Sequence, residues 1–160
     1  MLRDHAIKMS DLTLRLFALC QEREASFVAR YDMHVAEFRC LYTLLKNDKI
    51  SVKELAKLLN NTPSRLTRVV DSLLKRGLVQ RYEPESDRRL KIISLTEKGK
   101  NLIKEMKYNY DSMQMEILSE IKDNSHDQIL ESIKKLIEAM ENWKVKCESA
   151  KENKKPTKKN

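Results

Sequence analysis

The stretch Thr62-Pro-Ser-Arg-Leu-Thr-Arg-Val-Val-Asp-Ser-Leu-Leu-Lys-Arg-Gly77 decides the fold of this chain. Its apolar residues recur at the spacing of a single helix face: Leu66, Val69, Val70, Leu73 and Leu74. The Thr62 hydroxyl can cap the first amides, and Pro63 suits the first helical position because its missing N–H needs no partner there. Gly77 can adopt the left-handed conformation that ends a helix. The stretch therefore predicts a short amphipathic helix.

The opposite face of this helix is polar and basic. It carries Ser64, Arg65, Thr67, Arg68, Asp71, Ser72, Lys75 and Arg76. Short hydroxyls and arginines at the front of a helix can reach base edges and phosphates in a DNA major groove. A surface helix with a solvated face has the same pattern, so the flanking residues have to decide between the two interpretations.

The flanks complete a known DNA-binding arrangement. Ser51 to Glu54 form a capping box that opens a helix over residues 52–59, and Asn60-Asn61 make a turn without the frequently seen glycine. Residues 78–82 and 91–95 have strand patterns and are joined by the charged, proline-containing segment 83–90. Together these elements predict a helix–turn–helix followed by a β-hairpin wing.

From about Val35 to Gly99, the chain resembles the MarR (multiple-antibiotic-resistance regulator) family of bacterial transcription factors. The segment 64–81 is similar to that family's recognition helix and first wing strand. Asp87-Arg-Arg89 and the later Leu95-Thr-Glu-Lys-Gly99 resemble its wing signature and the start of its long dimer helix. The resemblance implies a mainly α fold with a small β-hairpin wing, a winged helix–turn–helix plus long dimerisation helices.

The resemblance also implies a DNA site, double-stranded DNA as partner and a pseudo-palindromic operator. Each recognition helix would enter a major groove, and each wing would reach the adjacent minor groove. Arg89 holds the position that enters the minor groove, Asp87 can fix its guanidinium, and Arg88 suits a phosphate. The expected DNA-binding residues are Thr62, Ser64, Arg65, Thr67, Arg68, Asp87, Arg88 and Arg89.

Length and composition bound the remainder. The chain has 160 residues with only two glycines and three prolines, so we expect one mostly helical domain over residues 1–149. Further helices are expected over residues 4–29, 35–46 and 96–122, with a brief strand at Ile50. We expect no membrane segment, because no apolar run approaches the length needed, and no signal peptide is visible. A cytoplasmic location is therefore expected.

The net charge of +8 is unevenly distributed. Residues 63–99 carry nine Lys and Arg against five Asp and Glu, and residues 144–160 carry seven Lys against two Glu. Positive charge on the winged unit is the footprint expected for phosphate contact. The terminal residues 150–160 are rich in Lys and Asn, and we expect a disordered tail there.

The first and last helices have apolar seams without partners in the winged unit. Ser125 to Gln128 read as a capping box that opens the last helix, after the break at 123–125. We therefore expect an intertwined homodimer, built by helices at about 4–29 and 96–148. Its predicted interface residues are Leu12, Leu16, Ile129, Ile133, Leu136, Met140 and Trp143.

The sequence predicts no catalytic residue, no cofactor and no metal site. The three histidines are isolated, and Cys20, Cys40 and Cys147 have no metal-like spacing. We expect all three cysteines to be reduced and packed as small hydrophobic residues.

Effector binding is the open point at this stage. Members of the resembled family bind small phenolic or aromatic acids in a crevice between the winged unit and the dimer helices, which makes Arg15, Arg23, Tyr31, Arg39 and Tyr42 candidates. Others sense oxidants through a cysteine, although that cysteine would lie near Ser10 rather than at Cys20. The leading hypothesis is a dimeric repressor released by a small effector. The alternatives are a protein–protein interaction module and a redox-sensing regulator that uses Cys20, and an enzyme ranks lowest.

Overall fold

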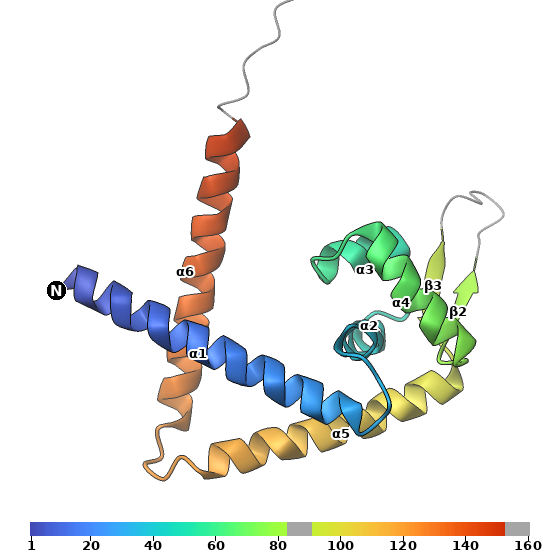
Figure 1. Ribbon diagram of the computed structural model, residues 1–160, viewed down its shortest axis with the longest axis horizontal. Coiled ribbons are helices and arrows are strands. Elements are labelled where there is room, and N and C mark those ends of the chain that lie inside the picture. Colours follow the sequence, from blue (N-terminus) through green and yellow to red (C-terminus); the bar gives the residue numbers. More distant parts are fainter. Residues whose placement is uncertain (83–90, 153–160) are drawn as a thin grey trace, which may run out of the picture. The chain divides into compact units, whose positions relative to one another are not determined.

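The computed structural model describes the backbone of residues 1–82 and 91–152 and the side chains of residues 1–82 and 91–149. In chain order, the elements are α1 (Leu2–Ala29), α2 (Val35–Lys46), β1 (Ile50–Ser51), α3 (Val52–Leu58), α4 (Pro63–Lys75), β2 (Val79–Tyr82), β3 (Ile92–Leu95), α5 (Glu97–Ser119) and α6 (His126–Glu152) (Figure 1). The predicted fold class, mainly α with a small β wing, is confirmed.

The predicted helix caps of the helix–turn–helix are present. The Ser51 hydroxyl accepts from the Glu54 amide at 3.1 Å, and the Glu54 carboxylate accepts from the Ser51 amide at 3.2 Å. The Thr62 hydroxyl accepts from the Arg65 amide at 3.4 Å. Where the turn lacks glycine, Asn60 adopts a φ of 48°, which asparagine tolerates better than most residues.

Gly77 ends α4 with a φ of 66°. Its amide donates to the Leu74 carbonyl at 2.9 Å, and the Leu78 amide donates to the Leu73 carbonyl at 3.0 Å. This pair of bonds satisfies carbonyls that the helix itself leaves free, which is the usual glycine ending of a helix. The end of α4 and the entry into the wing are therefore determined by one residue.

A three-stranded antiparallel sheet with the order β1-β3-β2 lies beside α4 (Figure 1). Ile50 pairs with Ile93, which confirms the brief strand predicted at Ile50. Val79 pairs with Leu95 and Tyr82 with Ile92, so the wing strands are held in a fixed register. The sheet anchors the wing on the helix–turn–helix.

The chain divides into two compact units, one up to Asp111 and one from Ser112 onward. The first unit has a continuous apolar core, whose largest fully buried side chains are Leu41, Leu44, Leu55, Leu66, Leu73, Leu78, Ile93, Ile103 and Met106. This core also holds the buried carboxylates of Glu24 and Glu37. Neither carboxylate was among the residues expected in the core.

The second unit comprises the end of α5 and α6. α5 ends at Ser119, earlier than the predicted 122, because Glu120 and Ile121 donate to carbonyls three residues back. The Ser125 hydroxyl, expected to cap α6, donates to the Asp123 carboxylate. α6 continues to Glu152, so the backbone at 150–152 is helical where disorder was expected, and residues 153–160 lie outside the described part.

Candidate nucleic-acid interface

The N-terminal half of α4 presents the side chains that the sequence predicts for DNA contact. Thr62, Ser64, Arg65, Thr67 and Arg68 are all exposed, while Leu66 and Val70 on the other face are fully buried. The Thr67 hydroxyl donates to the Pro63 carbonyl at 2.9 Å within the helix. Because the helix is anchored through its apolar face, the polar side chains lie in a fixed order on an open surface. The guanidiniums of Arg65 and Arg68 and the hydroxyls of Thr62 and Ser64 can donate to base edges and phosphates.

Three residues in the C-terminal half of the same polar face make contacts within the protein, although Asp71 and Lys75 are exposed. The Ser72 hydroxyl donates to the Glu37 carboxylate at 2.6 Å. Arg76 donates to the Asp32 carbonyl at 2.9 Å, and Asp71 pairs with Arg81 at 2.9 Å. A helical spacing cannot separate a residue that faces water from one that faces another helix, so the sequence alone did not indicate these contacts.

The Asp71–Arg81 pair joins the recognition helix to the first wing strand. Arg81 lies on β2, and its side chain is 27% exposed against 50% for Asp71. The pair therefore fixes the base of the wing relative to α4. The remaining predicted wing residues, Asp87, Arg88 and Arg89, lie outside the described residues, and their role in DNA binding stays a prediction.

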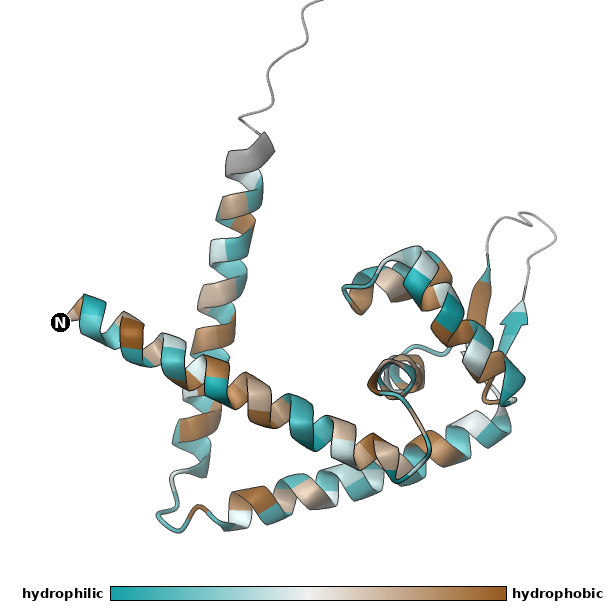
Figure 2. Cartoon of the chain, in the orientation of Figure 1, coloured by the Kyte–Doolittle hydropathy of each residue, from teal (hydrophilic) through white to brown (hydrophobic). Residues whose placement is uncertain are grey.

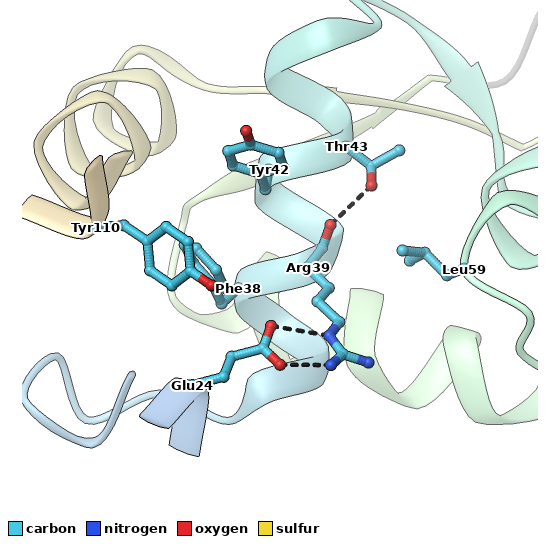
Figure 3. A pocket seen from close by; sticks show the side chains of 7 residues that line it. All are labelled: Glu24, Phe38, Arg39, Tyr42, Thr43, Leu59 and Tyr110. Carbon is cyan, nitrogen blue, oxygen red and sulfur yellow. Dashed lines mark hydrogen bonds and ion pairs between the residues drawn. The ribbon is translucent and has the colours of Figure 1, made fainter. Parts of the chain in front are cut away.

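A small cavity of about 230 Å³ lies in the first unit (Figure 3). It is lined by Glu24, Phe38, Arg39, Tyr42, Thr43, Leu59 and Tyr110. Phe38 and Tyr110 pack in a tilted arrangement with ring centroids 5.6 Å apart. A cavity with aromatic walls and few polar groups suits a small organic ligand.

The charged groups of the cavity are paired with one another. Two nitrogens of the Arg39 guanidinium donate to the Glu24 carboxylate (Figure 3). Nε donates to Oε1 at 2.9 Å, and Nη2 donates to Oε2. The hydrogen bond that Arg39 donates to Glu24 raises the pKa of Arg39. The Arg39 side chain is 54% exposed, whereas Glu24 is 12% exposed, so only the guanidinium can exchange its partner for water at small cost.

The predicted effector residues are divided by the structure. Arg39 and Tyr42 line the cavity, whereas Arg15 is exposed on α1 and Tyr31 is engaged elsewhere, its hydroxyl accepting from the Asn109 amide at 2.7 Å. Sequence reasoning missed Glu24 as a cavity residue. The signal was present, because Glu24 precedes the buried Phe27 and Val28 by three and four residues and so shares their helix face.

Comparisons with known proteins agree with this geometry. The model of the MarR family matches residues 33–91. The transcriptional repressor MprA of Escherichia coli strain K12 is 30% identical over 137 residues, which cover 84% of this chain and 78% of MprA. The chain belongs to the MarR family.

Two further proteins extend this result. The uncharacterized HTH-type transcriptional regulator YhbI of Bacillus subtilis strain 168 is 32% identical over 83 residues, and the match spans about half of each protein, 52% of this chain and 54% of YhbI. The MepR–DNA complex of Staphylococcus aureus has a TM-score of 0.69 at 20% identity and covers 82% of this chain and 97% of MepR. This MarR-family chain therefore has the winged-helix fold of a regulator whose structure is known with DNA.

The thiols of the MarR-family chain differ in burial. Cys40 is fully buried, and burial, followed by the nearby Glu37 charge, raises the pKa of its thiol to about 12. Cys20 and Cys147 are half-buried, so the expectation that all three pack as buried hydrophobic residues holds only for Cys40. Within the described residues, no group of His, Cys, Asp and Glu is placed to hold a metal ion, and no helix is long and apolar enough to cross a bilayer.

Proposed function

We propose that this MarR-family chain is a cytoplasmic, dimeric repressor that binds a pseudo-palindromic operator and is released by a small aromatic effector. The exposed, firmly anchored N-terminal half of α4 carries this proposal. MprA is named as a repressor, and MepR forms a complex with DNA. Both facts support the same role for a chain that is similar to MprA in sequence and to MepR in fold.

The homodimer is supported by apolar residues of α1 and α6 that the single chain leaves exposed. Figure 2 shows hydrophobic positions interspersed along both helices. On α1, Leu12 is 67% exposed, and on α6 Met140 is 58% and Trp143 is 68% exposed. Ile133 and Leu16 extend these two seams, and Ile129 and Leu136 are half-buried. A second copy that covers both seams would remove this apolar area from water, which is favourable by about 25 cal/mol per Å².

The effector is supported by the size and walls of the cavity. Its volume of about 230 Å³ fits a single aromatic ring better than a larger ligand. Arg39 lines it, while Lys46 lies 4.6 Å from the Tyr42 ring centroid and Arg23 lies 5.7 Å from the Tyr110 ring centroid. One cation that lines the cavity and two cations beside its aromatic rings favour an aromatic acid, whose carboxylate would compete with Glu24 for Arg39.

The redox alternative uses Cys20, whose half-buried position on α1 leaves part of the side chain accessible. An oxidant would then replace the small effector as the releasing signal. A protein–protein interaction module remains the other alternative, because winged helices also serve that role. Treatment with peroxide tests the redox alternative. If Cys20 senses the oxidant, the wild type should release its DNA while a Cys20→Ser variant keeps it.

The central experiment selects duplexes from a randomised library and measures binding by fluorescence anisotropy at several salt concentrations. We expect a pseudo-palindromic consensus, binding that weakens steeply with salt and weaker binding for Arg65→Ala. Lys135→Ala, on the exposed surface of α6, is the matched control and should bind like the wild type. Absence of any selected sequence would reject the DNA-binding proposal in favour of the interaction module.

A further inference from the structure

Glu37 is a buried carboxylate with three partners on two elements and no role in the cavity. It lies in the first turn of α2 and is 4% exposed. Its Oε2 accepts from the His34 amide at 2.9 Å, and its Oε1 accepts from the Ser72 hydroxyl at 2.6 Å. The Arg76 guanidinium lies 3.6 Å from Oε2. One carboxylate therefore holds both the start of α2 and the C-terminal half of α4.

Arg76 extends this link to the connection between α1 and α2. Its two terminal nitrogens donate to the Asp32 carbonyl at 2.9 Å and the Tyr31 carbonyl at 3.3 Å. The Lys98 ammonium in turn donates to the Arg76 carbonyl at 2.9 Å. The end of the recognition helix is thus tied to segments 44 and 45 residues away in the sequence.

These polar contacts add directional constraints to a helix that its apolar face already anchors. Leu66, Val70 and Leu73 are fully buried and hold α4 against the core, but apolar packing fixes the rotation of a helix less sharply than hydrogen bonds do. Hydrogen bonds to a charged acceptor are directional, and breaking them would leave the Glu37 carboxylate buried without partners. Rotation of α4 would move Arg65 and Arg68, which lie on the same helix, away from the base edges.

We infer that Glu37, acting through Ser72 and Arg76, is a positioning residue for operator reading: it fixes the rotation of the recognition helix without touching DNA itself. This inference rests on the proposed DNA-binding function. It assigns Ser72 and Arg76, which lie on the polar side of α4, to orientation of the helix rather than to base contact. Loss of the link should therefore reduce discrimination between sequences more than overall attraction to DNA, because phosphate attraction depends on charge and not on helix rotation.

The test compares full-length wild type with Ser72→Ala, Glu37→Gln and the double variant. Each is titrated with the duplex that the wild type selects and with a random duplex of equal length at the same salt concentration. We expect Ser72→Ala to lose about tenfold in affinity for the selected duplex, as for one charge-assisted hydrogen bond. Its affinity for the random duplex should stay within about twofold, because its charge is unchanged.

The control is Ser149→Ala, since the hydrogen bond that the structure describes for the Ser149 hydroxyl lies within α6, to the Val145 carbonyl at 3.0 Å. It should match the wild type on both duplexes. The double variant should discriminate no worse than Glu37→Gln alone, because both changes remove the same link. Ser72→Ala keeps the carboxylate and removes one oxygen atom, so the test does not depend on whether Glu37→Gln folds.

Three results would overturn the inference. If Ser72→Ala loses equal factors on both duplexes together with melting temperature, the link is only structural. If it binds the selected duplex like the wild type, rotation of α4 does not depend on the link. If the wild type itself prefers no duplex, the proposed function fails first and the inference fails with it, which separates the two failures.

Discussion

Gly99, near the start of α5, lies against the backbone of Leu78 at the entry to the wing. A Cβ at this position would lie 1.9 Å from the Leu78 carbonyl oxygen. That oxygen also accepts from the Thr96 amide at 3.1 Å, so it cannot move without loss of the bond. We expect Gly99→Ala to lower the free energy of unfolding by about 1–3 kcal/mol through this overlap. Denaturant unfolding followed by circular dichroism measures the change.

The other glycine of the chain is the natural control. Gly77 has a φ of 66° but nothing within 4 Å of an added Cβ, so Gly77→Ala meets only backbone strain. Its expected cost is about 1 kcal/mol. If Gly99→Ala proves no more costly than Gly77→Ala, the close approach between α5 and Leu78 is absent in solution.

Cys40 provides a prediction about pH. Its pKa is raised from 9.0 to about 12, so the folded chain holds the thiol proton to higher pH than the unfolded chain. The resulting stability is complete below pH 9 and falls as pH rises from 9 toward 12. Cys40→Ala should show a shallower alkaline decline, measured as denaturation midpoints between pH 8 and pH 11. Identical slopes for the variant and the wild type would contradict the burial of this thiol.

At the scale of elements, the wing and α6 both carry basic residues, but only the wing is expected to read DNA. Arg89 follows Asp87 in the wing segment, where a guanidinium can enter a narrow, electronegative minor groove. We expect Arg89→Ala to weaken operator binding by about 1–3 kcal/mol. The measurement is fluorescence anisotropy at several salt concentrations.

The control for Arg89→Ala is the double variant Lys144→Ala, Lys146→Ala, which removes two exposed positive charges from α6. This double variant should lose less affinity, and the loss should shrink as salt is added because it arises from screened charges. Wild-type affinity for Arg89→Ala would indicate that the wing does not contact the operator.

The sequence predicted the starts and ends of capped helices better than any other feature of the fold. The capping box at Ser51, the cap at Thr62 and the glycine ending at Gly77 all occur as the local pattern predicts. Each depends on hydrogen bonds between residues at most five apart, which the sequence order itself brings together. Helix ends without such a signal, as at Ser119, were placed less well.

At the scale of the whole molecule, the proposed dimer predicts the effect of charges in the α6 seam. Ile133 and Met140 are 42% and 58% exposed in the single chain, and a partner would bury them. Ile133→Asp with Met140→Asp would place two carboxylates in an apolar interface, which costs several kcal/mol without partners. We expect monomers or insoluble protein, measured by size-exclusion chromatography with light scattering.

The control places the same charge elsewhere on α6. Lys135→Asp lies on the polar side, where Lys135 pairs with Glu131 at 3.6 Å, and it should leave the oligomeric state unchanged. A wild type that is monomeric at micromolar concentration would disprove the dimer, whatever the variants do.

The sequence by itself determined the elements of this protein, the polarity of α4 and the expectation of a DNA-reading winged helix. Spacing and capping act over a few residues, so they can be followed in the order of the chain. The same information placed Arg65 and Arg68 on an exposed helix face. It also identified two of the residues that line the cavity before any tertiary contact was known, Arg39 and Tyr42.

Only the tertiary structure decided which polar residues turn inward. Ser72 reaches Glu37 across 35 residues of sequence, and Arg39 reaches Glu24 across 15. Whether such a side chain meets water or a buried partner depends on how two helices pack and rotate, and a repeat of three or four residues does not encode that angle. The free half of α4 and its engaged half therefore look alike in sequence and differ only in the folded chain.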